Sequence, residues 1–191
     1  MARSIGKLLG PTLMVWSLLG CGGMGPTTFF HQDYDFGYLE RVAVVPLENL
    51  TADQGAAFRA TRMLITEILA TDAFEVVEPG ETARVLAEVG MVRAGELTQE
   101  QLTRIGKELG VQGIFLGSVD ESNTVRSGSS TVNVVTMTLR LVETDTGATV
   151  WSATHTEGGR GFWATAFGTG DRSMGEVTRA CISRLLGTLV K

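Results

Sequence analysis

The chain has 191 residues, of which 43% are hydrophobic and 19% are charged, and its formal net charge is −5. This length is sufficient for one compact domain with a hydrophobic core. The acidic balance, with lysine and arginine scattered along the chain, excludes the basic footprint of a nucleic-acid-binding protein, so we expect no nucleic-acid partner.

Residues 1–20 contain the three parts of an export signal. Arg3 and Lys7 supply the positive start, and the apolar stretch 8–19 is shorter than the roughly 20 residues that a membrane-spanning helix needs. The signal leads into Leu18-Leu19-Gly20-Cys21, which resembles the lipobox of bacterial lipoproteins. That resemblance implies acylation of the Cys21 thiol, cleavage before it and acylation of the new amino terminus. The alternative is a plain signal peptide cut nearby, or a short helix with an incidental cysteine.

Lipidation at Cys21 would determine where the protein resides. Gly22 rather than aspartate follows the cysteine, which resembles the pattern that sends lipoproteins to the outer membrane, with the folded domain facing the periplasm. Two or three acyl chains would give near-permanent anchoring, because each buried methylene contributes about 0.8 kcal/mol. Loss of Arg3 and Lys7 with the signal would lower the formal charge from −5 to −7.

Residues 21–38 are predicted to be a lipidated, aromatic-rich tether. Its start is rich in glycine, which disfavours regular structure, but the aromatic residues that follow are unusual in a disordered linker. The rings dock either on the chain's own domain or on a neighbouring subunit or partner. The candidates for protein contact here are Phe29, Phe30, Tyr34, Phe36 and Tyr38.

Residues 39–191 are predicted to form one domain of the α/β (α+β) class, a mixed β-sheet packed by helices in the order β-α-β-α-α-β-β-β-α. Apolar residues at helical spacing indicate the helices, and β-branched runs or alternating patterns indicate the strands. Thr51 to Gln54 and Thr98 to Gln101 each fit a capping box that begins a helix. The expected elements are strand 41–46, helix 51–70, strand 74–77, helix 79–89, helix 98–109, strands 113–119, 132–142 and 148–156, and a helix from residue 171 or 173 to about residue 186.

Several short motifs, in this order, resemble the curli-secretion lipoprotein (CsgG) superfamily, which includes the LpoB-type activators of penicillin-binding proteins and has a fold similar to the N-terminal domain of TolB. The resemblance covers residues 39–190, and its motifs are Val42 to Asn49, Phe74 to Glu78, Leu109 to Gly117 and Leu139 to Ala153. It implies a periplasmic domain that assembles with itself or docks on an export or wall-synthesis apparatus.

The family's channel members carry hairpins long enough to cross the outer membrane, and here the sequence departs from them. A spanning strand needs about 9–11 residues with alternating apolar side chains, whereas the connections 121–131 and 158–170 are short and the first of them is polar. We therefore favour a scaffold or regulatory component with a possible homo-oligomeric state. A pore-forming channel subunit is the first alternative, and a periplasmic enzyme of unknown type is the second.

Catalytic chemistry has little support in the sequence, and we expect no cofactor and no metal. His31 and His155 lack the spacing of a metal site and are predicted to be surface residues, while Cys181 is predicted to be a buried, inert thiol. The stretch 159–164 matches a loose dinucleotide fingerprint, but it follows a hairpin strand and does not open a helix. The same glycine-rich loop supplies three further candidates for protein or membrane contact, Phe162, Trp163 and Phe167. Packing of these rings as a cap on the core is the alternative.

Overall fold

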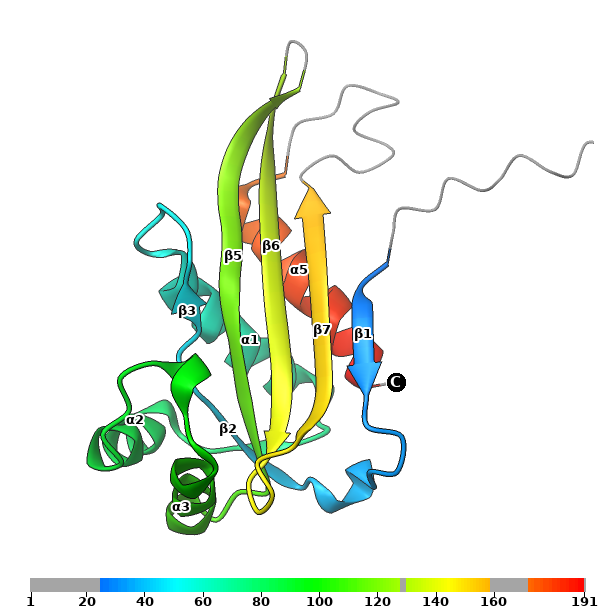
Figure 1. Cartoon of the computed structure of the whole chain (residues 1–191). Coiled ribbons are helices and arrows are strands. Elements are labelled where there is room, and N and C mark those ends of the chain that lie inside the picture. The colour runs from blue at the N-terminus through cyan, green and yellow to red at the C-terminus, as the bar shows by residue number, and fades with distance from the viewer. Residues whose placement is uncertain (1–24, 128–129, 159–171, 191) are drawn as a thin grey trace, which may run out of the picture.

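The computed structural model describes residues 25–127, 130–158 and 172–190. Figure 1 shows the helices and strands in the colours of the chain. In chain order they are β1 (Thr27–Phe30), the 3-10 helix η1 (Phe36–Tyr38), β2 (Arg41–Val44), β3 (Glu48–Asn49), α1 (Ala56–Thr71), β4 (Glu75–Val76), α2 (Pro79–Glu88), the 3-10 helix η2 (Ala94–Glu96), α3 (Gln99–Leu109), β5 (Gly113–Ser127), β6 (Ser130–Glu143), β7 (Thr149–Gly158) and α5 (Met174–Leu189).

The strands form one seven-stranded mixed sheet in the order β1-β7-β6-β5-β2-β4, and β3 also pairs with β5. Strand β2 is parallel to β4 and β5, whereas β5, β6, β7 and β1 are successively antiparallel. The predicted fold class and element order are confirmed by β2-α1-β4-α2-α3-β5-β6-β7-α5. Strands β1 and β3 were not predicted, because the strands with which they pair lie far away in the sequence.

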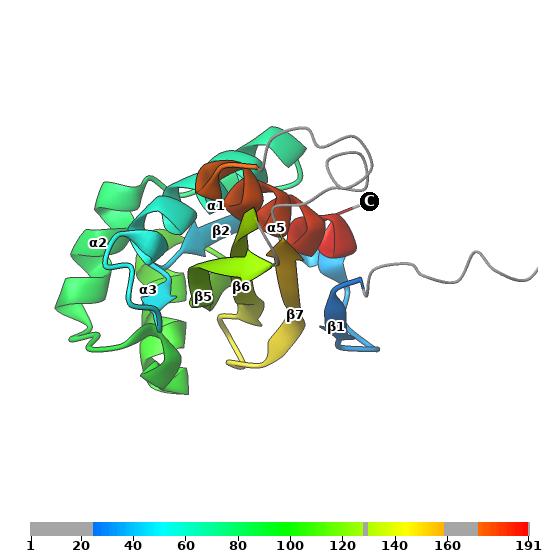
Figure 2. The ribbon, with the colours of Figure 1, turned by 90° about the horizontal axis from the view of Figure 1, so that it is seen from above.

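The helices form two layers on opposite faces of the sheet, as the view from above shows (Figure 2). Helices α1 and α5 cover one face, where Leu64 and Ile182 pack with the strands around Trp151 and Phe115. Helices α2 and α3 cover the other face only beside β2 and β5, where Val85 and other side chains close a second core. No described helix covers β6, β7 and β1 on that second face.

Local capping signals correctly predicted two of the helix starts. Thr98 caps α3 with the predicted capping box to Gln101, and α3 ends at Gly110, which has a positive φ of 63°. Ser173, one of the two predicted caps of the last helix, forms a capping box with Glu176. Serine and threonine at these positions accept hydrogen bonds from backbone N–H groups that have no partner within the helix.

The capping box predicted at Thr51 was wrong, because α1 begins only at Ala56. The Thr51 hydroxyl instead donates to the side chain of Asn49 at 2.9 Å and accepts from the backbone N–H of Asp53 at 3.1 Å. Local side-chain hydrogen bonds of this kind stabilise a turn in competition with a helix. The expected strand ends were also wrong, since β5 and β6 continue through most of the predicted connection 121–131.

Contacts with the start of α5 explain why the β5–β6 hairpin is longer than expected. The Ser122 hydroxyl lies 3.6 Å from the sulfur of Met174, and the Asn133 side chain donates to the carbonyl of Arg172 at 2.9 Å. Thr124 donates to Asn133 across the hairpin at 2.8 Å. Polar residues that read as a loop in the sequence therefore form a twisted ribbon, which extends beyond the helices in Figure 1.

Candidate functional site

The aromatic residues predicted for protein contact between positions 29 and 38 divide into two groups. Tyr34 and Phe36 are half-buried against the core under α1 and α5, and their rings meet edge to face with centroids 5.2 Å apart. Phe29, Phe30 and Tyr38 remain 50%, 40% and 53% exposed. The segment therefore packs in part on the chain's own domain and still presents three aromatic surfaces to the solvent.

Strand β1 forms one edge of the sheet, beside β7. The backbone N–H of His31, just beyond β1, donates to the carbonyl of Val150 at 2.9 Å. Because hydrogen-bonding directions alternate along an antiparallel pair, Phe29 also directs its backbone groups toward β7, and Thr28 and Phe30 direct theirs away. No described strand pairs with that outer side, so its backbone groups can accept a strand from another chain.

A row of hydroxyl groups lies on the uncovered face of the sheet. The Thr136 and Thr156 hydroxyls lie 2.9 Å apart, those of Thr138 and Thr154 lie 3.1 Å apart, and Thr138 also donates to Asp120 at 2.7 Å. These side chains form hydrogen bonds with one another across β5, β6 and β7. The face is consequently a polar surface next to the exposed ring of Phe29, which lies opposite Ser152 on the same face.

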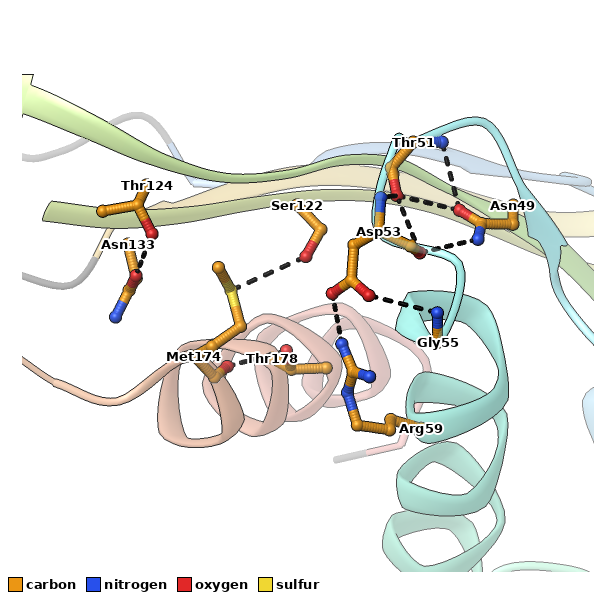
Figure 3. A network of polar contacts seen from close by, with 10 residues as sticks. All are labelled: Asn49, Thr51, Asp53, Gly55, Arg59, Ser122, Thr124, Asn133, Met174 and Thr178. Carbon is orange, nitrogen blue, oxygen red and sulfur yellow. Dashed lines mark hydrogen bonds and ion pairs between the residues drawn. The ribbon is translucent and has the colours of Figure 1, made fainter.

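Figure 3 shows the polar contacts at the end of the molecule where α1 and α5 begin. The Asp53 carboxylate accepts from the backbone N–H of Gly55 at 3.1 Å and forms an ion pair with Arg59. Asn49 in turn donates to the carbonyl of Asp53 at 2.8 Å. These bonds fix the turn between β3 and α1, so we interpret them as structural.

A buried ionic cluster joins β7 to α5. The Glu157 carboxylate, in a residue only 8% exposed, contacts His155 at 3.1 Å, Arg172 at 2.8 Å and Arg184 at 2.8 Å. Burial alone would raise the pKa of Glu157, but the hydrogen bonds from Arg172 and His155 and the charge of Arg184 outweigh it. The pKa of Glu157 is therefore lowered.

The prediction that His155 lies on the surface was wrong, since only 7% of the residue is exposed. The alternation along β7 contained the signal, because residues 151, 153, 155 and 157 share one face of a strand and Trp151 is plainly apolar. His31 is exposed as predicted. Sequence reasoning missed the whole cluster because its arginines come from the segment around α5.

Cys181 is buried, as predicted, and its Sγ–H donates to the carbonyl of His155 at 3.4 Å. Burial, with the charge of Glu157, raises the pKa of the Cys181 thiol to about 12. A thiol of this kind is not ionised at neutral pH and cannot act as a nucleophile.

Three hollows lined by described residues are open to the solvent. One of about 640 Å³ follows the exposed side of α3, between Gln99 and Glu108. Its polar groups are the ends of long surface side chains, and it contains no serine, cysteine or histidine that could act as a nucleophile beside a base. The described residues also contain no cluster of three metal-binding side chains.

Four of the predicted site residues, Cys21, Phe162, Trp163 and Phe167, lie outside the described residues. Their roles in lipidation and contact stay predictions. Among residues 25–127, 130–158 and 172–190, no helix is both long and apolar enough to cross a membrane.

Solved structures with the same fold come from several bacteria. The PelC dodecamer from Paraburkholderia phytofirmans matches with a TM-score of 0.59 and 18% identity, over 87% of this chain and 98% of that one. Lipoprotein GNA1162 from Neisseria meningitidis matches with a TM-score of 0.53 and 18% identity, over 62% and 82% of the two chains. The hypothetical protein CT253 from Chlamydia trachomatis matches with a TM-score of 0.56 and 10% identity, over 79% and 95%.

A search of curated proteins found no match. A family model, however, matches residues 27–156, which is more than half of the chain. The matched region begins at the first residue of β1 and ends within β7, so it contains six of the seven strands completely and most of the seventh. The chain therefore belongs to the family of the peptidoglycan-synthase activator LpoB.

Proposed function

We propose that the protein is a non-catalytic lipoprotein of the outer membrane that binds a peptidoglycan synthase and raises its activity. The observation that carries this proposal is the match of the peptidoglycan-synthase activator family to residues 27–156. The uncovered sheet face and the exposed edge strand are compatible with a protein that acts by contact.

The edge strand β1, with Phe29, Phe30 and Tyr38, is the proposed contact surface. It combines three exposed aromatic rings with a strand edge that no described strand pairs with, and aromatic residues contribute most of the binding energy in many interfaces. Five residues lie between Cys21 and Thr27, so β1 would begin within about 22 Å of the Cys21 Cα atom. The contact surface would consequently stay close to the membrane.

Binding of purified peptidoglycan synthases from the same organism to the full chain in detergent tests this proposal. We expect at least one synthase to bind, and we expect the Phe29→Glu/Tyr38→Glu double variant to bind about tenfold more weakly or worse. Lys107→Glu, on the exposed side of α3, is the matched charge control and should bind as the native protein does. Failure of every synthase to bind contradicts the proposal, and equal binding of the double variant contradicts the role of β1.

Self-association is the second candidate, in which the chain is a scaffold of a larger envelope assembly. It is favoured by the PelC match, because that protein was solved as a dodecamer and shares the fold over nearly its whole length. The wider kinship with the curli-secretion superfamily and the pore-forming and enzymatic alternatives stay predictions.

A further inference from the structure

Helix α1 presents an exposed ridge that no described element of the fold covers. Phe58 is 67% exposed and Leu69 is 55% exposed, the highest values among the large apolar side chains of the described helices. They are 11 residues apart, which is three turns of an α-helix, so both lie on the same side of α1. The adjacent stripe of α1, with Leu64 and Ile68, packs on the sheet.

The two ends of this ridge differ in charge. At the Phe58 end, the guanidinium of Arg62 lies 5.8 Å from the centre of the Phe58 ring, and Arg59 and Arg179 line the same hollow. The ion pairs between Arg59 and Asp53 and between Arg179 and Glu67 leave Arg62 as the cation without an ion-pair partner among the described residues of this hollow. The carboxylate of Glu176 also lines the hollow, and it accepts hydrogen bonds from Ser173 at the start of α5.

At the Leu69 end, a hollow of about 790 Å³ has an apolar floor and acidic groups at its rim. Glu40 and Asp72 are exposed at this rim and have no ion-pair partner among the described residues, whereas Glu75 pairs with Arg41 at 3.0 Å. The C-terminal ends of α1 and α5 also border the hollow and add a negative potential. The floor is formed mainly by Phe36, Leu39, Leu69, Phe74, Val76 and Leu189.

From this arrangement we propose that two copies of the chain associate through α1, with the two α1 helices antiparallel about a twofold axis. Phe58 of each copy would enter the acidic-rimmed hollow of the other and contact its Leu69. The guanidinium of Arg62 lies over the ring of Phe58. In this dimer it would therefore face the acidic rim of the other copy, where Glu40 and Asp72 lie. A single twofold contact would cover both ends of both ridges at once. Twofold dimers are also the commonest protein oligomers.

This surface lies on the helix layer, so it is separate from the proposed synthase-binding edge at β1. Association of two copies would bury Phe58 and Leu69 and would leave Phe29 and Phe30 of β1 accessible, whereas Tyr38 lies beside the hollow, between its lining residues Gly37 and Leu39. The inference therefore does not depend on synthase binding, and each of the two can fail while the other holds.

A charge-exchange experiment tests the contact on the full chain in detergent, with mass measured by sedimentation. The native protein should be a dimer, whereas Arg62→Glu and Glu40→Arg should each weaken association about tenfold or more, because each places like charges together. An equal mixture of the two variants should recover the dimer. In the mixed dimer, one contact pairs the two introduced side chains, which have opposite charges, and the other contact retains the native pair. Lys107→Glu makes the same kind of charge change on α3 and should remain dimeric.

Cross-linking tests the twofold geometry. In the Phe58→Cys/Leu69→Cys variant, a bismaleimide of about 10 Å span should join two copies and stop at a dimer, since helix axes pack about 8–10 Å apart. The buried Cys181 should not react in the folded protein. A monomeric native protein, an unaffected Arg62→Glu variant, a mixture that stays monomeric, or a ladder of larger cross-linked products would each overturn the proposal.

Discussion

Phe30 of the edge strand lies directly opposite Trp151 of β7 in antiparallel register. Trp151 is fully buried, and its indole N–H donates to the Thr188 hydroxyl of α5 at 3.1 Å. Phe30 also meets Phe36 edge to face, with centroids 6.0 Å apart. The aromatic segment near the predicted anchor is thus tied to the centre of the domain.

The register of β1 predicts that two neighbouring proline substitutions will have different effects. Phe29→Pro should detach β1, because the N–H of Phe29 faces β7 and proline cannot donate. Thr28→Pro is the matched control, since the N–H of Thr28 faces away from β7. Limited proteolysis between residues 27 and 31 should be about tenfold faster in Phe29→Pro than in Thr28→Pro. Phe29→Ala separates the loss of the ring from the loss of the hydrogen bond, and equal cleavage of both proline variants would show that β1 is not held this way.

The close packing around Gly106 predicts that a larger side chain at this position of α3 will destabilise the fold. A Cβ atom added at Gly106 would lie 2.5 Å from the Cβ of Thr144, whose hydroxyl donates to the Val111 carbonyl at 2.9 Å. Gly106→Ala should lower the free energy of unfolding by about 2 kcal/mol, because the added methyl overpacks a buried contact. Gly187→Ala, where nothing lies within 4 Å, should instead raise stability by up to about 1 kcal/mol through helix propensity. Urea unfolding measures both, and a neutral Gly106→Ala would contradict the close approach.

The Glu157 cluster predicts a loss of stability in acid. Because the folded-state pKa of Glu157 is lowered, its contribution is present above the unfolded pKa of about 4.3 and is lost as the pH falls through the folded pKa. Glu157→Gln should cost about 2 kcal/mol at pH 7 and should flatten the stability profile between about pH 5 and pH 3. Glu121→Gln, on the uncovered face, is the control. Thermal unfolding across this range measures the effect, and an unchanged slope in Glu157→Gln would refute it.

The reactivity of the Cys181 thiol should distinguish the folded chain from the unfolded chain. At pH 8 the folded chain should not react with iodoacetamide at this residue, because its raised pKa and burial leave almost no accessible thiolate. The unfolded chain in urea should react at the ordinary rate of a cysteine. Mass spectrometry of peptides containing Cys181 distinguishes the two, and fast labelling of the folded protein would contradict its packing between β7 and α5.

The sequence predicted those features that depend on local interactions. The capping boxes at Thr98 and Ser173 depend only on hydrogen bonds between residues three positions apart in the sequence. The order of the helices and strands follows from the periodicity of the apolar residues. Strand β1 could not be predicted in this way, because Thr27 pairs with Thr154 far along the chain. The length of the β5–β6 hairpin likewise depends on contacts with α5.

The candidate site was predictable to a smaller extent. The pattern of rings from Phe29 to Tyr38 indicated a contact segment, but only packing decides that Phe36 turns inward and Tyr38 stays outside. The exposed ridge of α1 could not be predicted from the sequence for a similar reason. Phe58 and Leu69 have the spacing of buried residues on an amphipathic helix, whereas the sheet contacts the adjacent stripe that contains Leu64 and Ile68.

The rate of glycan polymerisation tests the central claim most directly. The peptidoglycan synthases of the same organism would be reconstituted in vesicles, and the full chain would be added at increasing concentration. We predict that the initial rate of at least one synthase rises with saturation and that the Phe29→Glu/Tyr38→Glu variant needs a higher concentration. A rate that stays unchanged for every synthase, at concentrations well above those needed for binding, would contradict the assignment of this protein as an activator.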